Sequence, residues 1–596
     1  MRQSSMRLAV AVAAVSSAGR GHADPLQPWG GAGLNEWMNA SKAVVISDMT
    51  RCTPSSALSP NVGKGRWKIL PYVLRGGQRG KMVCAGQETG APPLRLPLGA
   101  SGWHAIFVGV FSTSEAPSQV WLKLDTDPAP TPRYNRSTAH YGNVEDVFFK
   151  VAELTESVAL HIRQQSAGFT CGCGIAHVKL VPLTEAEVQR VRQRRNDPSR
   201  RNLAATCDGF SFIYYRRPTT AEELLSEVEI YRDTDFGTLY LHSPGADKVN
   251  YASKVGHMKG TGIEDFPRAG DRHFVEAIRE LARRKINPVK VLIDGAHDVG
   301  MRIHVGIRPA GWSFFEPYAE YWESPFYRQH PQWRCEDRDG TPVTRMSWAV
   351  PEVRKHFIDL LAEQVAFGAD GAHIVFNRGY PLVLYERPFR DLFEKQHAID
   401  PRKIPESDPR IGGMWSGVVT AFFRELRAVL DAEQQRRGDG KRLAISACVL
   451  GHEQDNLRYG VDVRRLVNEG LLDEIMVYGW GFGNKRAGYE LAFFKEVCGP
   501  KNIPFRPSLA VHWPDLGRRV GQAISFYEGG AAGAAIWDAG IKDIYEWTLM
   551  SRLGRLEDAR GHLKHIKGAK PPHTYHRFHR LGNHVRDGRF GPYWGG

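Results

Sequence analysis

Polar side chains recur at the ends of the strand-like runs in the C-terminal two thirds of the chain. Each run is short and apolar, and residues able to bind a ligand or move a proton follow it. In chain order they are Tyr214 and Arg216, His242, Arg308, Asn377 and Arg378, Glu453, Tyr478 and Trp480, His512 and Trp513, and Asp538, preceded by Trp537. Such a ring is typical of a functional site, because barrel enzymes take catalytic groups from the ends of several strands.

Two carboxyl groups are what glycoside hydrolysis normally needs, one to protonate the leaving oxygen and one to act as nucleophile or to activate water. Our candidates are Glu386, in the apolar stretch PLVLYE, and Asp538, at the end of the last strand, with Glu453 in reserve. An apolar setting would raise the pKa of Glu386 and keep it protonated, while Asp538 would stay ionised. Glu386 could instead pair with a neighbouring arginine, and Asp538 could cap a helix.

The insertion from Arg308 to Trp348 contains ten aromatic residues, Trp348 included. Sugar rings stack on aromatic side chains, and their hydroxyl groups need charged or amide partners, so this composition suits a saccharide cleft. We expect at least half of these rings to form a small core beneath the loop. The predicted substrate-binding residues are Arg308, Trp312, Asn377, Arg378, Tyr385, Tyr478, Trp480, His512, Trp513 and Trp537.

The elements that would position these residues alternate between strand and amphipathic helix after residue 205. Strands are predicted at 210–215, 238–241, 302–307, 372–377, 443–449, 474–478, 505–511 and 534–538. Eight such units indicate an α/β fold, a (β/α)8 TIM barrel over residues 206–556. The long insertions after strands two, three and four would then surround the carboxyl face, where the active sites of this fold lie.

The N-terminal part of the chain does not show the alternation of strand and helix. Short strand-like runs over residues 40–185, separated by turn residues, predict a β-sandwich domain that precedes the barrel and could bind carbohydrate. Residues 186–205 are predicted to be a linker, into which one helix of the charged stretch 184–201 runs, and residues 557–596 a basic, His-rich and largely irregular tail. Residues 1–23 have the pattern of a signal peptide, with Arg2 and Arg7 before an apolar run, so we expect a secreted or periplasmic protein.

The composition limits the classes of partner that we expect for this protein. No apolar run approaches the roughly 20 residues that a membrane helix needs, so we expect no membrane span in the mature chain. The net charge of +14 would suit an anionic carbohydrate substrate and would also suit nucleic acid. Since no nucleic-acid motif is present, we expect a carbohydrate partner and no nucleic acid. We also expect no cofactor and no bound metal.

Four stretches resemble a known family: GMRIHVGIRPAGW, VPEVRKHFIDLLAEQV, GADGAHIVFNRGYPLVLYE and DNLRYGVDVRRLVNEGLLDEIMVYGW. They are similar to the family-10-like glycosyl hydrolases, and the similarity covers roughly residues 210–537. The resemblance implies a glycosidase barrel with an acidic residue at the end of strand four, followed by an arginine. This chain has Asn377 and Arg378 there, so the arginine matches and the acid does not.

Two other functions fit the same residues. A carbohydrate-binding barrel without catalysis would explain Asn377 in place of an acid. A metal-dependent barrel hydrolase would use His304, His373 and His512, which lie on or at predicted strands.

Overall fold

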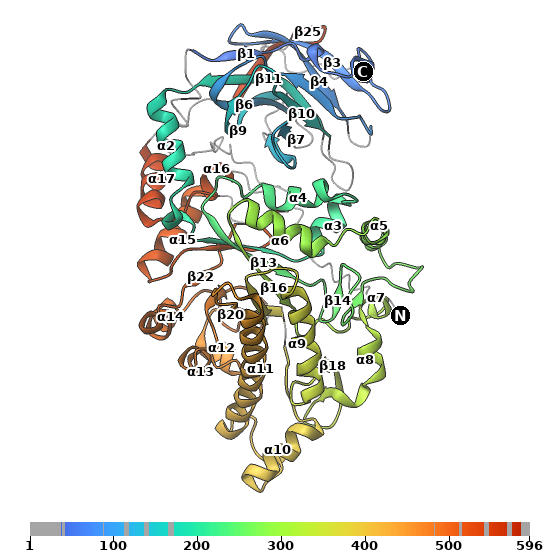
Figure 1. Cartoon of the computed structure of the whole chain (residues 1–596), viewed down its shortest axis with the longest axis vertical. Coiled ribbons are helices and arrows are strands. Elements are labelled where there is room, and N and C mark those ends of the chain that lie inside the picture. Colours follow the sequence, from blue (N-terminus) through green and yellow to red (C-terminus); the bar gives the residue numbers. More distant parts are fainter. Residues whose placement is uncertain are drawn as a thin grey trace, which may run out of the picture.

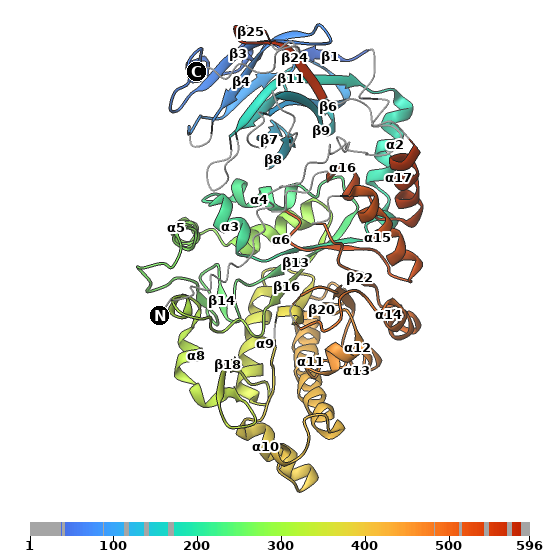
Figure 2. The same ribbon diagram turned by 180° about the vertical axis from the view of Figure 1, so that it is seen from behind.

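The computed structural model describes residues 37, 42–86, 89–112, 118–135, 142–164, 172–378, 380–481, 483–511, 515–540, 547–568 and 575–585. The expected signal peptide lies outside them. Figures 1 and 2 show antiparallel sheets at one end of the molecule and alternating strands and helices in the remainder, with α10 (Arg387–His397) at the opposite end. None of the described helices is long and apolar enough to cross a membrane.

The predicted barrel is confirmed as a nearly closed ring of eight parallel strands. In chain order these are β12 (Leu203–Cys207), β13 (Phe236–His242), β16 (Arg302–Ile307), β19 (Gly371–Val375), β20 (Ala444–Leu450), β21 (Glu474–Tyr478), β22 (Phe505–Pro507) and β23 (Ala535–Ile536). From β12 to β22 each strand pairs with the next in the chain, and β23 pairs with β12. A bridge between Ser508 and Ala535 joins the two remaining edges, so the sheet wraps round on itself.

The first strand differs from the prediction. Residues 210–215 are not a strand, because Ser211–Arg216 form the short helix α3, and the strand that pairs with β13 is Leu203–Cys207. The aromatic run FIYY has high strand propensity, but tertiary packing places the small residues of LAATC in the crowded ring instead. Tyr214 and Arg216 therefore do not follow strand one, and Asp208 does.

Helices surround the barrel and begin at the signals that the sequence contains. Thr220 caps α4 by accepting a hydrogen bond from the Glu223 amide, and Pro351 begins α9. The main barrel helices are α4 (Ala221–Glu229), α5 (Ala269–Arg283), α6 (Pro288–Asp298), α9 (Pro351–Val365), α11 (Pro409–Arg437), α13 (Val463–Asn468), α14 (Leu491–Cys498), α15 (Leu516–Glu528) and α17 (Leu556–Gly568).

Insertions extend the carboxyl ends of strands two to four, as predicted. They contain β14 (Lys248–Val249), β15 (His257–Met258), α7 (Ala319–Trp322), α8 (Pro325–Gln329), β17 (Arg334–Glu336), β18 (Pro342–Met346) and α10. Figure 1 shows most of them gathered on one flank of the barrel, beside α9. They therefore build a wall next to the carboxyl ends of these strands.

Two antiparallel sheets occupy residues 44–182. The larger contains β1 (Val44–Ile46), β2 (Leu58–Ser59), β3 (Trp67–Leu74), β4 (Arg79–Ala85), β6 (Gly102–Ser112), β9 (Asn143–Leu154) and β11 (Cys173–Pro182), and the smaller contains β5 (Leu94–Pro97), β7 (Ser118–Leu124), β8 (Thr131–Asn135) and β10 (Ala159–Arg163). Side chains from both sheets share one core, including Val108 of β6 and Leu122 of β7. The helix expected in the charged stretch before the barrel is α2 (Glu185–Arg195), which leads to the barrel.

The tail is not irregular throughout, contrary to expectation. After α17 the chain returns to the larger sheet, where β24 (Tyr575–Leu581) pairs with β9 on one side and with β3 on the other, and β25 (His584–Val585) follows. Figure 2 shows this red strand among blue and teal ones. Strand pairing between the two ends of a chain is non-local, so no local pattern in the tail predicts it.

Phe578→Ala tests the role of this strand. Phe578 is 2% exposed and packs edge-on against Tyr72 and Phe111, so its removal should destabilise the fold by about 3–5 kcal/mol. The exposed neighbour is the control, since His579→Ala should cost less than about 0.5 kcal/mol. Thermal unfolding of both variants decides, and equal midpoints would show that the strand contributes nothing.

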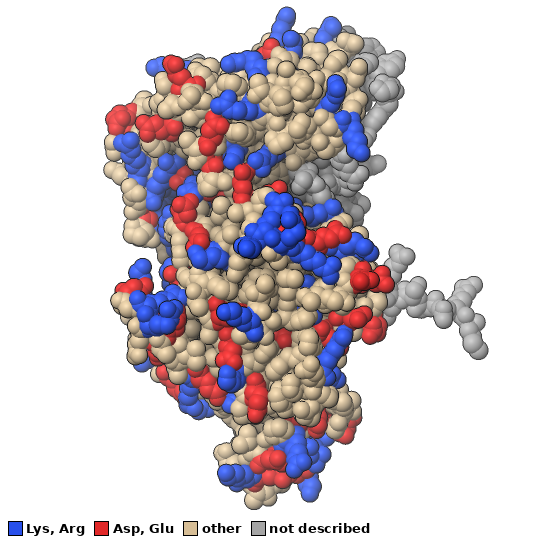
Figure 3. All heavy atoms as spheres, turned by 45° about the vertical axis from the view of Figure 1, so that its right-hand side comes forward, with Lys and Arg blue, Asp and Glu red and all other residues tan. Residues whose placement is uncertain are grey.

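Charged residues of both signs cover the surface shown in Figure 3. Lys and Arg are mixed with Asp and Glu over the sheets and over the barrel. Neither sign of charge is confined to one patch on this face.

Candidate functional site at the barrel mouth

Alternation along the strands decides which side chains face the barrel interior. Ala204, Tyr240, Val375, Cys448 and Met476 share a small cluster that is separate from the core beneath the helices, and they come from five different strands. Successive side chains of a strand point to opposite faces, so residues two positions further on also face inward. At the carboxyl ends this rule selects Asp208, His242, Arg308, Asn377, Tyr478 and Trp537.

Asp208 follows β12 and is held in one orientation. Its Oδ1 accepts hydrogen bonds from the amides of Phe210 (3.0 Å) and Ser211 (2.6 Å), and its Oδ2 accepts one from the Ser211 hydroxyl (2.5 Å). Arg308 Nη2, at the end of β16, lies 3.6 Å from Oδ2. The first turn of α3 and an arginine of the barrel thus fix this carboxylate.

Asp538 follows β23, the neighbour of β12. Its amide donates to Thr206 Oγ1 (2.7 Å), and that hydroxyl donates to Asp538 Oδ1 (3.2 Å). Its φ of +48° is in the left-handed region, which aspartate adopts more readily than most residues other than glycine. Thr206 lies on β12 and Asp208 directly follows it, so a single strand end positions both carboxyl groups.

Arg378 lies in the same crowded mouth, and its side chain is accessible. The pKa of Arg378 is lowered, first by loss of hydrating water and second by the charge of Arg308, while Asp538 and Asp208 act in the opposite direction. The guanidinium also lies over the Trp537 ring, 5.4 Å from its centroid. Two arginines, two carboxylates and an aromatic ring therefore meet here.

Two buried polar side chains of the mouth have no hydrogen-bond partner among the described residues. Both ring nitrogens of His242 and both amide atoms of Asn377 are unpaired, although the two residues are 1% and 0% exposed. Burial lowers the pKa of His242 well below its usual value, and the charges of His373, Arg308 and Arg378 lower it further, so the ring is neutral. Unpaired groups of this kind are available to bond a ligand, since leaving them unpaired costs free energy.

Aromatic rings also line the barrel mouth. Tyr478 and Trp537 pack edge to face with centroids 5.2 Å apart, and His242 lies 5.5 Å from Trp537. The structure thus brings together Arg308, Asn377, Arg378, Tyr478, Trp537 and Asp538 of the predicted site.

Glu386 has a different setting from the one expected. It is 1% exposed, and its Oε2 accepts from the amides of Leu384 (3.0 Å) and Glu336 (3.4 Å), while Ser347 donates to Oε1. Burial raises the pKa of Glu386, as predicted. These partners all belong to the insertions, so the carboxyl group joins the loop after β19 to β17 and to the segment after β18.

Other predicted residues also have structural partners outside the ring. Glu453 begins α12 (Glu453–Leu457) and accepts from Arg464 (3.3 Å), and Trp480 donates to the Tyr489 hydroxyl (2.9 Å). Trp312 and Tyr385, 1% and 2% exposed, pack within the main hydrophobic core, against Phe357 of α9 and Trp415 of α11 respectively. His512 and Trp513 lie outside the described residues.

Two of the three histidines proposed for a metal, His304 and His373, are on the strands below the mouth. Nδ1 of His304 and Nδ1 of His373 are each 2.8 Å from the Ser446 hydroxyl, and both side chains are fully buried. Among the residues that the structure describes, no group of three or more His, Cys, Asp or Glu side chains is arranged to hold a metal ion.

Asp208 and Glu227 are the carboxyl groups that sequence reasoning missed. Glu227 of α4 is buried, accepts from Arg216 (2.7 Å) and lies so close to Gly540 that a side chain there would collide with it. Burial raises the pKa of Glu227 to about 7, against the charge of Arg216. It therefore supports the loop that follows Asp538. The sequence signal for Asp208 was available, because Asp208-Gly209 is a turn pair directly after an apolar run.

The fold and the ring of polar residues define a (β/α)8-barrel protein with two carboxyl groups at its mouth. No protein-family model and no curated protein matches the chain. The resemblance to family-10-like glycosyl hydrolases is therefore not confirmed.

Solved structures with some similarity include three carbohydrate-active proteins. A cycloisomaltooligosaccharide glucanotransferase of Paenibacillus sp. is 11% identical, with a TM-score of 0.31 over 75% of this chain and 53% of that one. An alpha-galactosidase of Thermus thermophilus is 13% identical (TM-score 0.31; 84% and 95%), and a glycoside hydrolase domain of Bordetella bronchiseptica is 12% identical (TM-score 0.36; 62% and 99%). This chain thus spans about half the length of the glucanotransferase. The functional argument below depends on the residues of the mouth.

Proposed function

We propose that the protein is a glycoside hydrolase that cleaves a glycosidic bond at the barrel mouth, with Asp208 and Asp538 as its two carboxyl groups. The observation that carries this proposal is their placement at the ends of neighbouring strands, with Thr206 bonded to Asp538 two residues before Asp208. One carboxyl group would protonate the leaving oxygen, and the other would attack the anomeric carbon or activate water. Glu386 of the predicted pair is replaced by Asp208 in this account.

The surrounding side chains suit a sugar. Arg308, Arg378, Asn377 and His242 offer donors and acceptors to hydroxyl groups, and Trp537 with Tyr478 offers a surface on which a ring can stack. The two arginines are also compatible with an anionic substrate.

A glycan panel tests the proposal. We expect the wild-type chain to release new reducing ends from at least one polysaccharide or oligosaccharide, with activity unchanged by EDTA. Binding without hydrolysis across the panel would favour the non-catalytic carbohydrate-binding function. Loss of activity with EDTA and recovery with zinc would favour the metal-dependent hydrolase.

Glu386→Gln separates the two choices of carboxyl group. The amide oxygen can still accept from Ser347 or Leu384, so kcat should change by less than about threefold, while the unfolding temperature falls. Initial rates on the best panel substrate measure the first effect and calorimetry the second. A drop in kcat of more than about a hundredfold in a folded variant would show that Glu386 is a catalytic carboxyl group.

A further inference from the structure

A cavity of about 400 Å³ lies in the insertions that follow strands two and three of the barrel. One wall comes from β14, β15 and the chain after them, and the other comes from α7, α8 and the turn between them. The two insertions are joined near their origins, because the Ala246 amide donates to the Gly311 carbonyl oxygen (3.1 Å). Ala246 is close in the chain to His242, and Gly311 is close to Arg308, so the wall that holds this cavity adjoins the barrel mouth.

Lys248 of β14 lines this cavity and is 2% exposed. Among the residues that the structure describes, its ammonium group makes no hydrogen bond and no ion pair. Burial lowers the pKa of Lys248 to about 8, and the opposing charges of Asp247 and Glu323 do not outweigh it. The ammonium group is therefore still charged at pH 7. A buried cation without a countercharge favours a ligand that supplies one.

The other charged side chains of the lining have partners or are in contact with water. Glu323 accepts hydrogen bonds from the Ser313 hydroxyl (2.8 Å) and from Arg328 Nε (3.1 Å). Arg328 also donates through Nη2 to the carbonyl oxygen of Glu320 (3.5 Å). The side chain of Glu320 is exposed, so water can solvate its carboxylate. In this lining, Lys248 is thus the charged group that is both buried and unpaired.

The second buried lysine of the same insertion has a different environment. Lys259 is fully buried, and its Nζ lies 3.8 Å from the centroid of the Tyr321 ring and 3.5 Å from that of the Trp322 ring. Aromatic faces of this kind attract an ammonium group. The protein itself therefore supplies the partners of Lys259, whereas it supplies none for Lys248.

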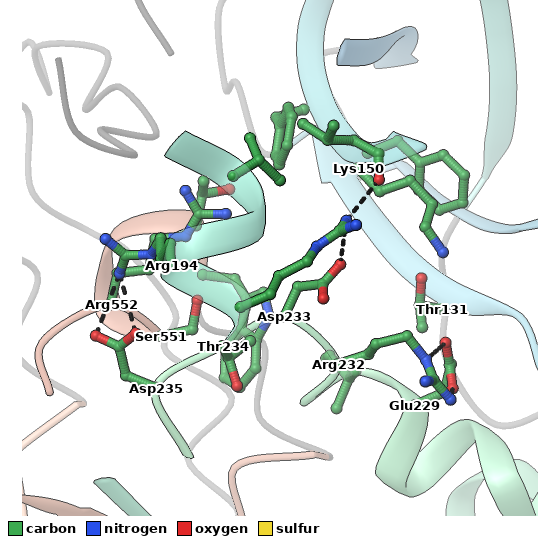
Figure 4. Close-up of a pocket in the computed structure, with 18 of the residues that line it drawn as sticks. Thr131, Lys150, Arg194, Glu229, Arg232, Asp233, Thr234, Asp235, Ser551 and Arg552 are labelled. Atoms are coloured by element: carbon green, nitrogen blue, oxygen red, sulfur yellow. Dashed lines mark hydrogen bonds and ion pairs between the residues drawn. The ribbon is translucent and has the colours of Figure 1, made fainter. Parts of the chain in front are cut away.

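A second cavity, between the N-terminal sheets and the barrel, also differs from the one at Lys248. It is lined by β8, β9, α2 and residues 547–552, among other segments. Figure 4 shows Arg194 bonded there to Asp235 (3.0 Å) and Arg232 bonded to Glu229 (2.7 Å). Acids and cations of that wall thus pair with one another.

We propose that the cavity at Lys248 binds a sugar unit that carries a carboxylate group, a uronic acid, with the carboxylate on Lys248. His257, opposite Lys248 in the pairing of β14 with β15, lines the cavity together with Thr261 and Gln329, and all three can bond to sugar hydroxyl groups. The volume lies within the roughly 300–1,000 Å³ of small-molecule pockets. The inference rests on the proposed function in one respect, since the uronic acid would belong to the glycan that is cleaved at the mouth.

Titration calorimetry on the full chain tests the binding site without hydrolysis. Sodium glucuronate, glucose and sodium acetate are titrated separately, at ionic strength held constant with sodium chloride. We expect glucuronate to bind at least about tenfold more tightly than the other two, because only glucuronate offers both the charge and the hydroxyl groups. The proposal is overturned if glucuronate does not bind, or if glucose or acetate binds as tightly.

Variants then locate the bound sugar. Lys248→Met removes the ammonium group and should weaken glucuronate binding by about tenfold or more. Arg328→Gln, at an exposed position of the same lining, should weaken it by about threefold. Lys254→Met is the control for net charge, because Lys254 is exposed in the same insertion and does not line the cavity. Thermal unfolding checks that each variant is folded, and glucuronate affinities equal to the control for both cavity variants would overturn the proposal.

Kinetics on the glycan panel tests the link to the mouth. For a glycan with uronic acid units, Lys248→Met should raise KM by about tenfold and leave kcat within about threefold of the wild type. Normal hydrolysis of such a glycan with an unchanged KM would overturn the inference and leave the proposed function standing. Absence of hydrolysis across the panel would contradict the proposed function and the link to cleavage, while the calorimetry still decides whether the cavity binds the sugar.

Discussion

Asp538→Asn and Asp208→Asn are each expected to lower kcat by about 10²–10⁴-fold while the affinity for glycan stays within about threefold. The amide keeps the size of the carboxyl group but can neither protonate the leaving oxygen nor attack the anomeric carbon. Asparagine also tolerates the left-handed backbone of Asp538, so the variant should keep its loop. Initial rates on the best panel substrate and titration calorimetry with the same glycan measure the two effects.

Asp515→Asn is the matched control, because Asp515 lies in the loop after β22 but caps α15 by accepting from the Arg518 amide. Asparagine caps helices about as well as aspartate, so kcat and stability should remain near those of the wild type. If Asp208→Asn and Asp538→Asn behave like this control, the two carboxyl groups do not perform the chemistry.

A loss of stability as large as that of Phe578→Ala is expected from Glu474→Gln, at the end of the barrel opposite the mouth. Glu474 is 2% exposed, accepts from Arg506 (3.0 Å) and Tyr240 (3.1 Å), and is paired with Arg302. Removing one partner of a buried ion pair leaves an uncompensated charge, and the cost is about 3–5 kcal/mol. Urea unfolding followed by tryptophan fluorescence at pH 7 measures the loss.

Glu469→Gln provides the comparison, because Glu469 also contacts two arginines, Arg424 and Arg465, but on the surface. Its loss should cost less than about 1 kcal/mol. Equal shifts for the two variants would contradict the role given to Glu474.

The Glu474 contribution should also depend on pH. The charges of Arg506, His304 and Arg302 outweigh burial and lower the pKa of Glu474 to about 2. A depressed folded-state pKa gives stability that is present above the unfolded value of about 4.5 and is lost as pH falls toward 2. The difference in stability between wild type and Glu474→Gln should therefore narrow between pH 4.5 and pH 2.

Local patterns predicted much of the barrel. The runs at 302–307 and 474–478 are strands with the predicted bounds, and Pro351 begins its helix. These segments combine apolar runs with clear stop signals, so propensity and packing agree. Strand one failed because LAATC is short and rich in alanine, whereas the aromatic run after it has the stronger local signal.

Because strand one was misplaced, one of the two proposed catalytic carboxyl groups, Asp208, was missed. With strand one placed seven residues too late, Asp208 fell before the strand and was never considered as a strand-end residue. The alternation rule corrects this once the register is known, because Ala204, Thr206 and Asp208 then point the same way. Glu386 was chosen for its apolar setting, but that setting turned out to be the interior of the insertions.

Contacts between distant segments could not be predicted from local patterns. The pairing of β24 with β3 and β9, and the cavity shared by β8, α2 and residues 547–552, depend on how the chain returns to its beginning. Hydrophobic periodicity reports which face of an element is buried but not which partner covers it. The tail accordingly looked irregular, although Phe578 is part of a core.

The most direct test of the central claim is a double-mutant cycle on kcat with Asp208→Asn, Asp538→Asn and the combined variant. Residues that act as one catalytic unit show strongly non-additive effects, so the combined variant should be no more than about tenfold slower than the slower single variant. Losses that multiply in the combined variant, or a combined variant as active as the wild type, would contradict a shared site at the barrel mouth.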